Sequence, residues 1–215
     1  MKSPESNISN WDDIAQRYQD KFMDLNIYNE SYDHFCNLLD KENPKILEIA
    51  CGPGNITKYL REIRPDLMID AIDSSPNMLR LAQINNPSVH FKLMDCRNLN
   101  QLSTSYDAIL VGFCMPYLSK LECAQLIQDA SRLLHSGGIF YFSTIEGLYE
   151  TSAYETSSDG KNSLFVYYHE TTYLKEMLFA NNFNILKFFT IKYQKSELKI
   201  ETHLIYIAKL ESRIN

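Results

Sequence analysis

The sequence of 215 residues lacks any apolar run that approaches the roughly 20 residues needed to cross a membrane. Its first residues, MKSPESNISNW, contain no apolar segment of the kind that forms the core of an export signal. We therefore expect a cytoplasmic protein with no membrane partner.

Cysteine pairs of the kind used in zinc sites and redox motifs are also missing. The five cysteines are odd in number, and no two are spaced as Cys-x-x-Cys. This argues against a disulfide framework and against a zinc site. We expect no bound metal, and cysteines that are reduced and mostly pack as small apolar side chains.

A block of basic residues, the usual electrostatic signature of nucleic-acid binding, is absent too. The formal net charge is −6, and Lys and Arg are not gathered on one predicted face. We therefore expect no nucleic-acid partner. What the chain does contain is typical of a globular domain, with 45% hydrophobic and 22% charged residues. Its 14 tyrosines and 11 phenylalanines fit either a core of large side chains or an aromatic-lined pocket.

Apolar periodicity predicts two N-terminal helices, over 11–26 and 28–39, followed by a regular alternation of strands and helices. The alternation predicts βαβ units and a mostly parallel sheet within a three-layer α/β sandwich. The predicted strands are 45–50, 67–73, 88–95, 106–113 and 138–144, and the predicted helices are 56–63, 76–85 and 120–135, the last of them ended by Gly137 and Gly138.

The rhythm breaks after residue 145. Residues 146–163 are polar and predict a long irregular loop, followed by a strand over 164–170 and a helix over 170–182. Two strand-like runs, 184–194 and 199–210, meet at Lys195 and Ser196 without room for a helix, so they must pair antiparallel. We expect seven strands in the main sheet, with this antiparallel hairpin at one edge.

The stretch ILEIACGPGNITKYL, residues 46–60, carries the clearest ligand-binding signal. The dinucleotide fingerprint G-x-G-x-x-G fails in both registers, and no G-K-[ST] follows that would make a phosphate-binding P-loop. What remains is E-x-A-x-G-x-G, in which Gly52 and Gly54 allow a tight turn close to a ligand. A carboxylate from Glu48 at the mouth of the crevice would repel a pyrophosphate and suit a positively charged nucleoside.

This pattern resembles the first motif of the class I S-adenosylmethionine-dependent methyltransferases, acidic-x-G-x-G-x-G, and the resemblance extends over about residues 45–145. It implies a Rossmann-like fold, S-adenosylmethionine as cofactor and transfer of a methyl group to an acceptor. Ala50 stands where the first glycine is usual, and we expect it to adopt ordinary backbone angles. Under the resemblance, Glu48 lies near the methionine amino group.

The resemblance implies further contacts with the cofactor. Asp73 would hold the ribose hydroxyls, Met78 would lie against the adenine, and Asp95 with Cys96 would meet the adenine edge. Helix capping by the two aspartates, and core packing by Met78, remain as alternatives. The full set of predicted cofactor-binding residues is Tyr18, Glu48, Ala50, Cys51, Gly52, Gly54, Asp73, Ser74, Met78, Asp95, Cys96, Phe113 and Cys114.

Catalytic residues are harder to name. His169 and Tyr117 are candidates on the acceptor side, with a surface histidine and a rim aromatic as the alternatives. Tyr18 would close over the methionine part or simply pack its helix. We expect a small-molecule methyl acceptor, or else a protein side chain, and a monomer or homodimer. A non-catalytic binding module and a nicotinamide-dependent reductase are the competing hypotheses.

We expect one domain over residues 1–215. It divides into a helical cap (1–43), a cofactor-binding core (44–145), a substrate-side loop (146–170) and a C-terminal helix with a strand hairpin (171–215).

Overall fold

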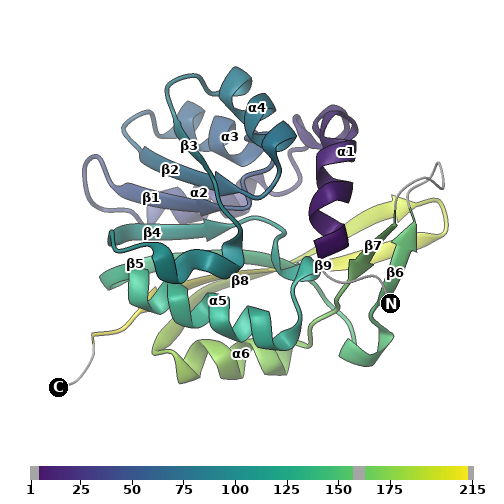
Figure 1. Cartoon of the computed structure of the whole chain (residues 1–215). Helices are drawn as coiled ribbons and strands as arrows, with labels where there is room; N and C mark the ends of the chain where they lie inside the picture. The colour runs from purple at the N-terminus through teal and green to yellow at the C-terminus, as the bar shows by residue number, and fades with distance from the viewer. Residues whose placement is uncertain (1–4, 157–162, 213–215) are drawn as a thin grey trace.

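The computed structural model describes residues 5–156 and 163–212, with the side chains of the first helix described from Trp11 onward. Its centre is a seven-stranded sheet in the order β3-β2-β1-β4-β5-β9-β8 (Figure 1). The first five strands are mutually parallel, and β9 runs antiparallel to both β5 and β8. The strands of this sheet are β1 (Lys45–Ile49), β2 (Met68–Asp73), β3 (His90–Leu93), β4 (Tyr106–Val111), β5 (Leu134–Ile145), β8 (Phe183–Ser196) and β9 (Lys199–Leu210). The predicted fold class is confirmed.

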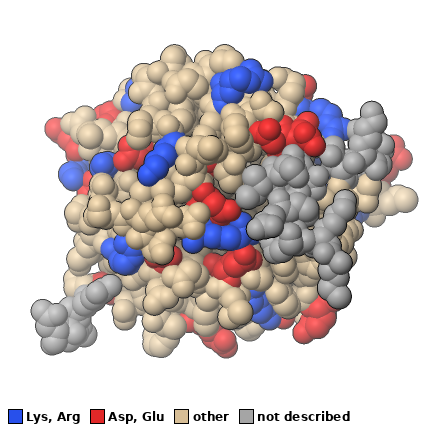
Figure 2. Space-filling model, viewed as in Figure 1, with Lys and Arg blue, Asp and Glu red and all other residues tan. Residues whose placement is uncertain are grey.

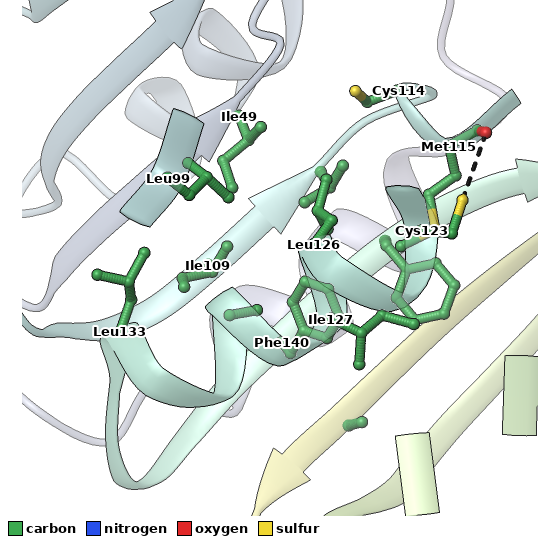
Figure 3. Close-up of a cluster of buried hydrophobic side chains, with 14 of the residues drawn as sticks. Ile49, Leu99, Ile109, Cys114, Met115, Cys123, Leu126, Ile127, Leu133 and Phe140 are labelled. Atoms are coloured by element: carbon green, nitrogen blue, oxygen red, sulfur yellow. Dashed lines mark hydrogen bonds between the residues drawn. The ribbon is translucent and has the colours of Figure 1, made fainter. Parts of the chain in front are cut away.

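Helices cover both faces of the sheet and make the three layers. One buried cluster joins α5 and α6 to one face, and Figure 3 shows Leu126 and Ile127 of α5 against Ile109 and Phe140. A second cluster joins α2 and α3 to the opposite face through Phe35 and other apolar side chains. The helices are α1 (Glu5–Phe22), α2 (Asn29–Asn37), α3 (Asn55–Ile63), α4 (Pro76–Asn85), α5 (Lys120–Leu133) and α6 (Thr171–Ala180), with 3₁₀ turns η1 (Cys96–Gln101), η2 (Met115–Tyr117) and η3 (Tyr149–Thr151).

The strand order reverses between β1 and β4, because β2 lies on one side of β1 and β4 on the other. In open α/β sheets, ligands bind outside the carboxyl ends of the strands at such a reversal. The helix α1 lies beside this end of the sheet and packs on α4 through a small cluster of Ala15, Met78 and Leu81. The topology therefore places the site between the β1–β4 edge and α1.

Several predicted boundaries were wrong. The helix α5 ends at Leu133, before Gly137, because Leu134 already pairs with Tyr106 of β4 and begins β5. The predicted strand over 106–113 ends at Val111, because Phe113 turns into the left-handed region with φ 53°. The strand predicted over 88–95 is likewise shorter, spanning His90–Leu93.

The segment predicted as an irregular loop contains a hairpin. Strands β6 (Ala153–Thr156) and β7 (Ser163–Val166) pair antiparallel, and the ring of Tyr154 meets the ring of Phe165 at 5.0 Å. Residues 157–162 of the predicted loop lie outside the described residues. The predicted strand over 164–170 stops at Val166, after which the chain leaves the hairpin to reach α6.

Charged side chains of both signs are interspersed on the face shown in Figure 2. Within the part of the chain that the structure describes, no helix combines the length and the apolar character that spanning a bilayer requires.

Candidate functional site

A first cavity of about 110 Å³ opens at the strand-order reversal. Its walls come from the ends of β1, β2, β3 and β4, from α4 and from α1. Ten of the thirteen predicted cofactor-binding residues line it, and they are Tyr18, Ala50, Gly52, Asp73, Ser74, Met78, Asp95, Cys96, Phe113 and Cys114. Residues that the sequence did not single out complete the wall, and they are Trp11, Met94, Arg97, Gly112 and Leu118.

Asp73, at the end of β2, holds the glycine turn in place. Its Oδ2 accepts the backbone N–H of Gly52 at 2.9 Å, and its Oδ1 accepts the backbone N–H of Ser75 at 2.8 Å. Burial raises the pKa of Asp73, and the backbone hydrogen bonds oppose that effect. Each carboxylate oxygen has a second lone pair, so Asp73 can fix the turn and still accept hydrogen bonds from a ligand.

The turn after β1 uses the left-handed region three times. Ala50, Gly52 and Gly54 have φ of 56°, 56° and 77°. The expectation of ordinary backbone angles at Ala50 was therefore wrong, because a non-glycine residue there carries a steric cost of about 1–2 kcal/mol. At Gly54 a Cβ would come within 2.5 Å of Asn86 Nδ2, so this glycine permits close packing of α3 on α4. Gly54 lines neither of the two cavities described here.

Glu48 lies behind the cavity wall and not at its mouth. Its side chain is fully buried, its Oε2 accepts the hydroxyl of Thr57 at 2.6 Å, and its Oε1 has no partner among the described residues. Burial raises the pKa of Glu48 to about 7. An orphaned buried carboxylate oxygen is costly, so Glu48 is a strained component of this region.

Asp95 follows the end of β3 and caps the 3₁₀ turn η1, which is the structural role that was the alternative to adenine binding. Its Oδ1 accepts the backbone N–H of Arg97 at 2.8 Å, and its Oδ2 pairs with the Arg97 guanidinium at 3.1 Å. The neighbouring thiols of Cys96 and Cys114 meet with their sulfurs 3.5 Å apart. Asp95 therefore shapes η1 while it also lines the first cavity.

A second cavity of about 290 Å³ adjoins the first. Seven residues belong to both walls, and they are Trp11, Tyr18, Ala50, Gly52, Gly112, Phe113 and Tyr117. Cys51 lines the second cavity only. Its lining is rich in aromatic rings, which come from α1, the α1–α2 connection, α2, the segment after β4, β8 and β9, while β6 and β7 add polar and aliphatic side chains. The volume approaches that of a pocket for a small organic molecule.

The polar part of the second cavity is a charged cluster. Lys195 Nζ pairs with the carboxylate of Glu155, and it lies 2.6 Å from Glu201 Oε1. His203 follows two positions after Glu201 on β9, and its Nδ1 lies 2.7 Å from the hydroxyl of Tyr28. The sequence reasoning did not single out any of these residues. A signal existed in KIETHLIY, where Glu201 and His203 occupy alternate positions, and so the same face, of a strand whose following residues are apolar.

The two catalytic candidates from the sequence lie in different places. Tyr117 lines both cavities, and its ring meets that of Trp11 at 4.7 Å. His169 lies in the core with no exposed surface, its Nε2 3.1 Å from the carbonyl oxygen of Met115. Burial lowers the pKa of His169, which keeps the imidazole neutral. Since it lines neither cavity, we assign His169 a structural position.

Comparison with known proteins agrees with this geometry. A family model described as "Methyltransferase domain" matches residues 46–138. The malonyl-[acyl-carrier protein] O-methyltransferase of Bacillus cereus is 31% identical over 122 residues, which are 56% of this chain and 42% of that protein. The demethylmenaquinone methyltransferase of Thermotoga maritima is 28% identical over 132 residues, 58% of each chain. The chain thus spans about half the length of these curated relatives.

Among solved structures, the complex of DhpI with SAH has the same fold. It superposes with a TM-score of 0.73 at 18% identity and covers 98% of each chain. The chain is thus similar to S-adenosylmethionine-dependent methyltransferases in its fold and, over residues 46–138, in its sequence. The matched segment, 46–138, runs from β1 to the start of β5. The match therefore covers most of the wall of the first cavity and leaves most of the second cavity outside it.

Proposed function

We propose that this protein transfers the methyl group of S-adenosylmethionine to a small organic acceptor held in the second cavity. The observation that carries the proposal is the shared wall, in which Phe113, Tyr117 and the Ala50–Gly52 turn border both cavities. A donor in one cavity and an acceptor in the other would meet at this wall. Orientation of two reactants in this way supplies much of the rate of a bimolecular transfer.

The residues present fit the cofactor. Asp73 retains free lone pairs for the ribose hydroxyls, and Met78 with Cys96 offers an apolar slot for the adenine. Because Gly52 has no side chain, a ligand can approach the backbone of the turn closely. A Cβ at this position would lie 3.7 Å from the ring of Tyr18, within the space that the ligand would use. Aromatic rings from Trp11 and Tyr18 suit a sulfonium through cation–π attraction. When bound, the cofactor supplies an electrophilic methyl group.

Two observations support a small acceptor over a protein side chain. The second cavity has a volume of about 290 Å³, which limits the size of the group that it can hold. The relatives named above take their names from demethylmenaquinone and from malonyl-[acyl-carrier protein], that is, from a small molecule and from a small group on a carrier. Both agree with an acceptor group that enters a pocket of limited size.

Thermal unfolding with S-adenosylmethionine, S-adenosylhomocysteine, ATP and NADH in separate samples tests the cofactor. A ligand at about 100 times its dissociation constant adds roughly 2.7 kcal/mol, which raises the melting temperature by about 5–10 °C for a domain of this size. We expect a rise with the two adenosyl ligands alone. Trp11, the single tryptophan of the sequence, lines both cavities, so its fluorescence gives an independent titration.

Turnover to S-adenosylhomocysteine with a panel of small phenols, thiols and amines tests the transfer. Binding of the adenosyl ligands without turnover on any acceptor would instead support a non-catalytic binding module. A rise with NADH alone would contradict the proposed cofactor.

A further inference from the structure

Three polar residues of the second cavity lie in a row, with one hydrogen bond between Tyr28 and His203 and an ion-pair distance between His203 and Glu201. Glu201 Oε2 lies 3.5 Å from Nε2 of His203, and Nδ1 of the same imidazole lies 2.7 Å from the hydroxyl oxygen of Tyr28. All three side chains are buried, with exposed fractions of 5%, 4% and 7%. The order carboxylate, imidazole, hydroxyl is the one that moves a proton away from a hydroxyl group in nucleophilic and acid–base catalysis.

The imidazole cannot easily turn out of this row. The ring of Tyr193 stacks on it with centroids 4.9 Å apart, and the ring of Phe113 meets it edge-on at 4.8 Å. Phe113 belongs to the wall that the two cavities share. The rings of Tyr193 and Phe113 therefore hold His203 beside the place where donor and acceptor would meet.

We infer that Glu201, His203 and Tyr28 form a proton relay that takes the proton of a hydroxyl acceptor bound in the second cavity, with the Tyr28 oxygen as the group that touches the acceptor. This inference rests on the proposed methyl transfer and names its acceptor class.

The charges around these residues set the direction of the hydrogen bond between Tyr28 and His203. Lys195 and Lys199 lie 2.6 and 3.3 Å from Glu201 Oε1. Burial raises the pKa of Glu201, but the contacts with His203 and the lysines outweigh it and hold the pKa at about 2. An ionised carboxylate facing Nε2 favours a proton on that nitrogen. Nδ1 then accepts the hydrogen of Tyr28, which leaves the lone pairs of the Tyr28 oxygen free to accept a hydrogen bond from a ligand in the cavity that Tyr28 lines.

The acceptor oxygen bonds to the methyl carbon, the bond from that carbon to the sulfonium sulfur breaks, and its electron pair stays on sulfur. The acceptor proton passes to the Tyr28 oxygen while the Tyr28 proton passes to Nδ1 of His203, so tyrosine ends as it began. Burial raises the pKa of Tyr28 above its ordinary value, so Tyr28 does not ionise by itself and must hand its proton on. Glu201 stabilises the resulting imidazolium, which later returns the proton to water.

The relay argues for a hydroxyl over other acceptors. A hydroxyl is a weak nucleophile until its proton leaves, whereas a thiol ionises readily near neutral pH. A carboxylate acceptor would share the second cavity with the carboxylates of Glu155 and Glu201. Aromatic walls, including Tyr28 and Phe113, suit a flat ring such as a phenol.

Histidine side-chain ¹⁵N spectra of the free protein provide the first test. The His203 signals are assigned by comparison with His203→Gln. We expect a protonated Nε2 and an Nδ1 that accepts a hydrogen bond in the wild type. Tyr28→Phe should change the ¹⁵N chemical shift of His203 Nδ1, because it removes the hydrogen bond to that nitrogen. Glu201→Gln should remove the preference for a proton on Nε2. A proton on Nδ1 in the wild type would overturn the relay.

Kinetics with phenol, a more acidic nitrophenol and thiophenol provide the second test. General acid–base catalysis contributes about 10²–10⁴-fold, so Tyr28→Phe should lower kcat with phenol by this factor. The loss should shrink with the nitrophenol and nearly vanish with the thiol, and affinity for S-adenosylhomocysteine should not change. The matched control is Tyr59→Phe on α3, which removes a hydroxyl bonded to Asp33 outside both cavities.

The outcomes separate the two proposals. Product from the wild type and from Tyr28→Phe at equal rates with phenol would overturn the relay and leave methyl transfer standing. Product with thiols or amines and none with any hydroxyl compound would do the same. No product from the wild type with any acceptor would overturn the proposed function, and the relay with it.

Discussion

The two cavities are assembled in different ways from the same chain. The wall of the first comes largely from β1 to β4, where each residue follows the end of its strand within a short turn. The polar cluster of the second joins residues far apart, with 175 positions between Tyr28 and His203 and 40 between Glu155 and Lys195. Residues that bind a ligand from one turn are neighbours in the sequence and form a recognisable pattern. Residues that meet only because distant strands pair form no such pattern. The family match accordingly covers the first cavity and stops before most of the second.

The largest expected effect separates packing from binding within the glycine turn. Gly54→Ala should lower the free energy of unfolding by about 2–4 kcal/mol, because the residue has φ 77° and its Cβ would lie 2.5 Å from Asn86 Nδ2. Affinity for S-adenosylhomocysteine should change little in the folded protein. The matched variant Gly52→Ala has more room, with 3.7 Å to Tyr18, but lies in the wall. Gly52→Ala should therefore lower the free energy of unfolding less than Gly54→Ala does, and it should weaken the binding of S-adenosylhomocysteine more.

Urea unfolding and calorimetry measure the two quantities. A double variant with Asn86→Ala isolates the clash from the backbone cost. Equal losses of affinity in Gly52→Ala and Gly54→Ala would mean that the turn acts as one binding unit, and that the distinction drawn here between packing and binding is wrong.

A pH effect should arise from Glu48. Its pKa of about 7 in the folded protein lies above the ordinary value of 4.5, so the folded state keeps a proton that the unfolded chain releases. Wild-type stability should therefore fall as pH rises from about 4.5 to 7. Glu48→Gln removes this dependence and should gain about 2–3 kcal/mol relative to the wild type between pH 5 and pH 8. Free energies of unfolding of both proteins at pH 5 and pH 8 measure this gain. If the two proteins lost the same stability between these pH values, the raised pKa of Glu48 would be contradicted.

Cofactor affinity should respond to Asp73. Asp73→Ala should weaken binding of S-adenosylhomocysteine by about 1–3 kcal/mol, roughly 5–150-fold, through lost hydrogen bonds to the ribose and a loosened Gly52 turn. Calorimetry measures it. Glu155→Gln, which alters a carboxylate of the second cavity alone, is the control and should leave this affinity unchanged. A comparable loss in the control would show that the two cavities do not act separately.

The smallest effect concerns Ala50. Ala50→Gly restores the residue usual in the family motif and relieves a left-handed φ of 56°. The relief of about 1–2 kcal/mol exceeds the entropic cost of glycine, about 0.5–1 kcal/mol, so the net gain in stability should be about 0.5 kcal/mol. Thermal and urea unfolding both measure it. A less stable glycine variant would mean that the alanine methyl makes packing contacts worth more than the strain.

The sequence predicted the sheet, the site edge and most of the first cavity, because these depend on strand ends and turns that are local. It did not predict that Glu48 would be buried, since hydropathy cannot tell whether Thr57 one turn into α3 will cover a carboxylate. It also did not predict the positive φ of Ala50, which the shape of the turn imposes. The strand over 164–170 was predicted, but its antiparallel partner β6 was missed because Ala153–Thr156 stands in a polar stretch without an apolar strand pattern.

The cluster of Tyr28, Glu201 and His203 was missed for a different reason. The polar residues of KIETHLIY are a local signal for a site, but only the pairing of β9 with β5 and β8 brings the carboxylate and imidazole beneath the α1–α2 connection. His169, by contrast, stood out in the sequence and lies in the core. A polar residue inside an apolar strand is a better guide to a site here than a histidine beside a loop.

The helix α1 touches both cavities and is fastened to α4 by Asp12, whose carboxylate accepts the Ser75 hydroxyl and the Asn77 backbone N–H, both at 2.7 Å. Trp11 and Tyr18 of this helix border both cavities. Any ligand that contacts them adds to the free energy that holds α1 in position. Thermodynamic linkage then makes the two occupancies interdependent, so that donor and acceptor each tighten the binding of the other by the same factor.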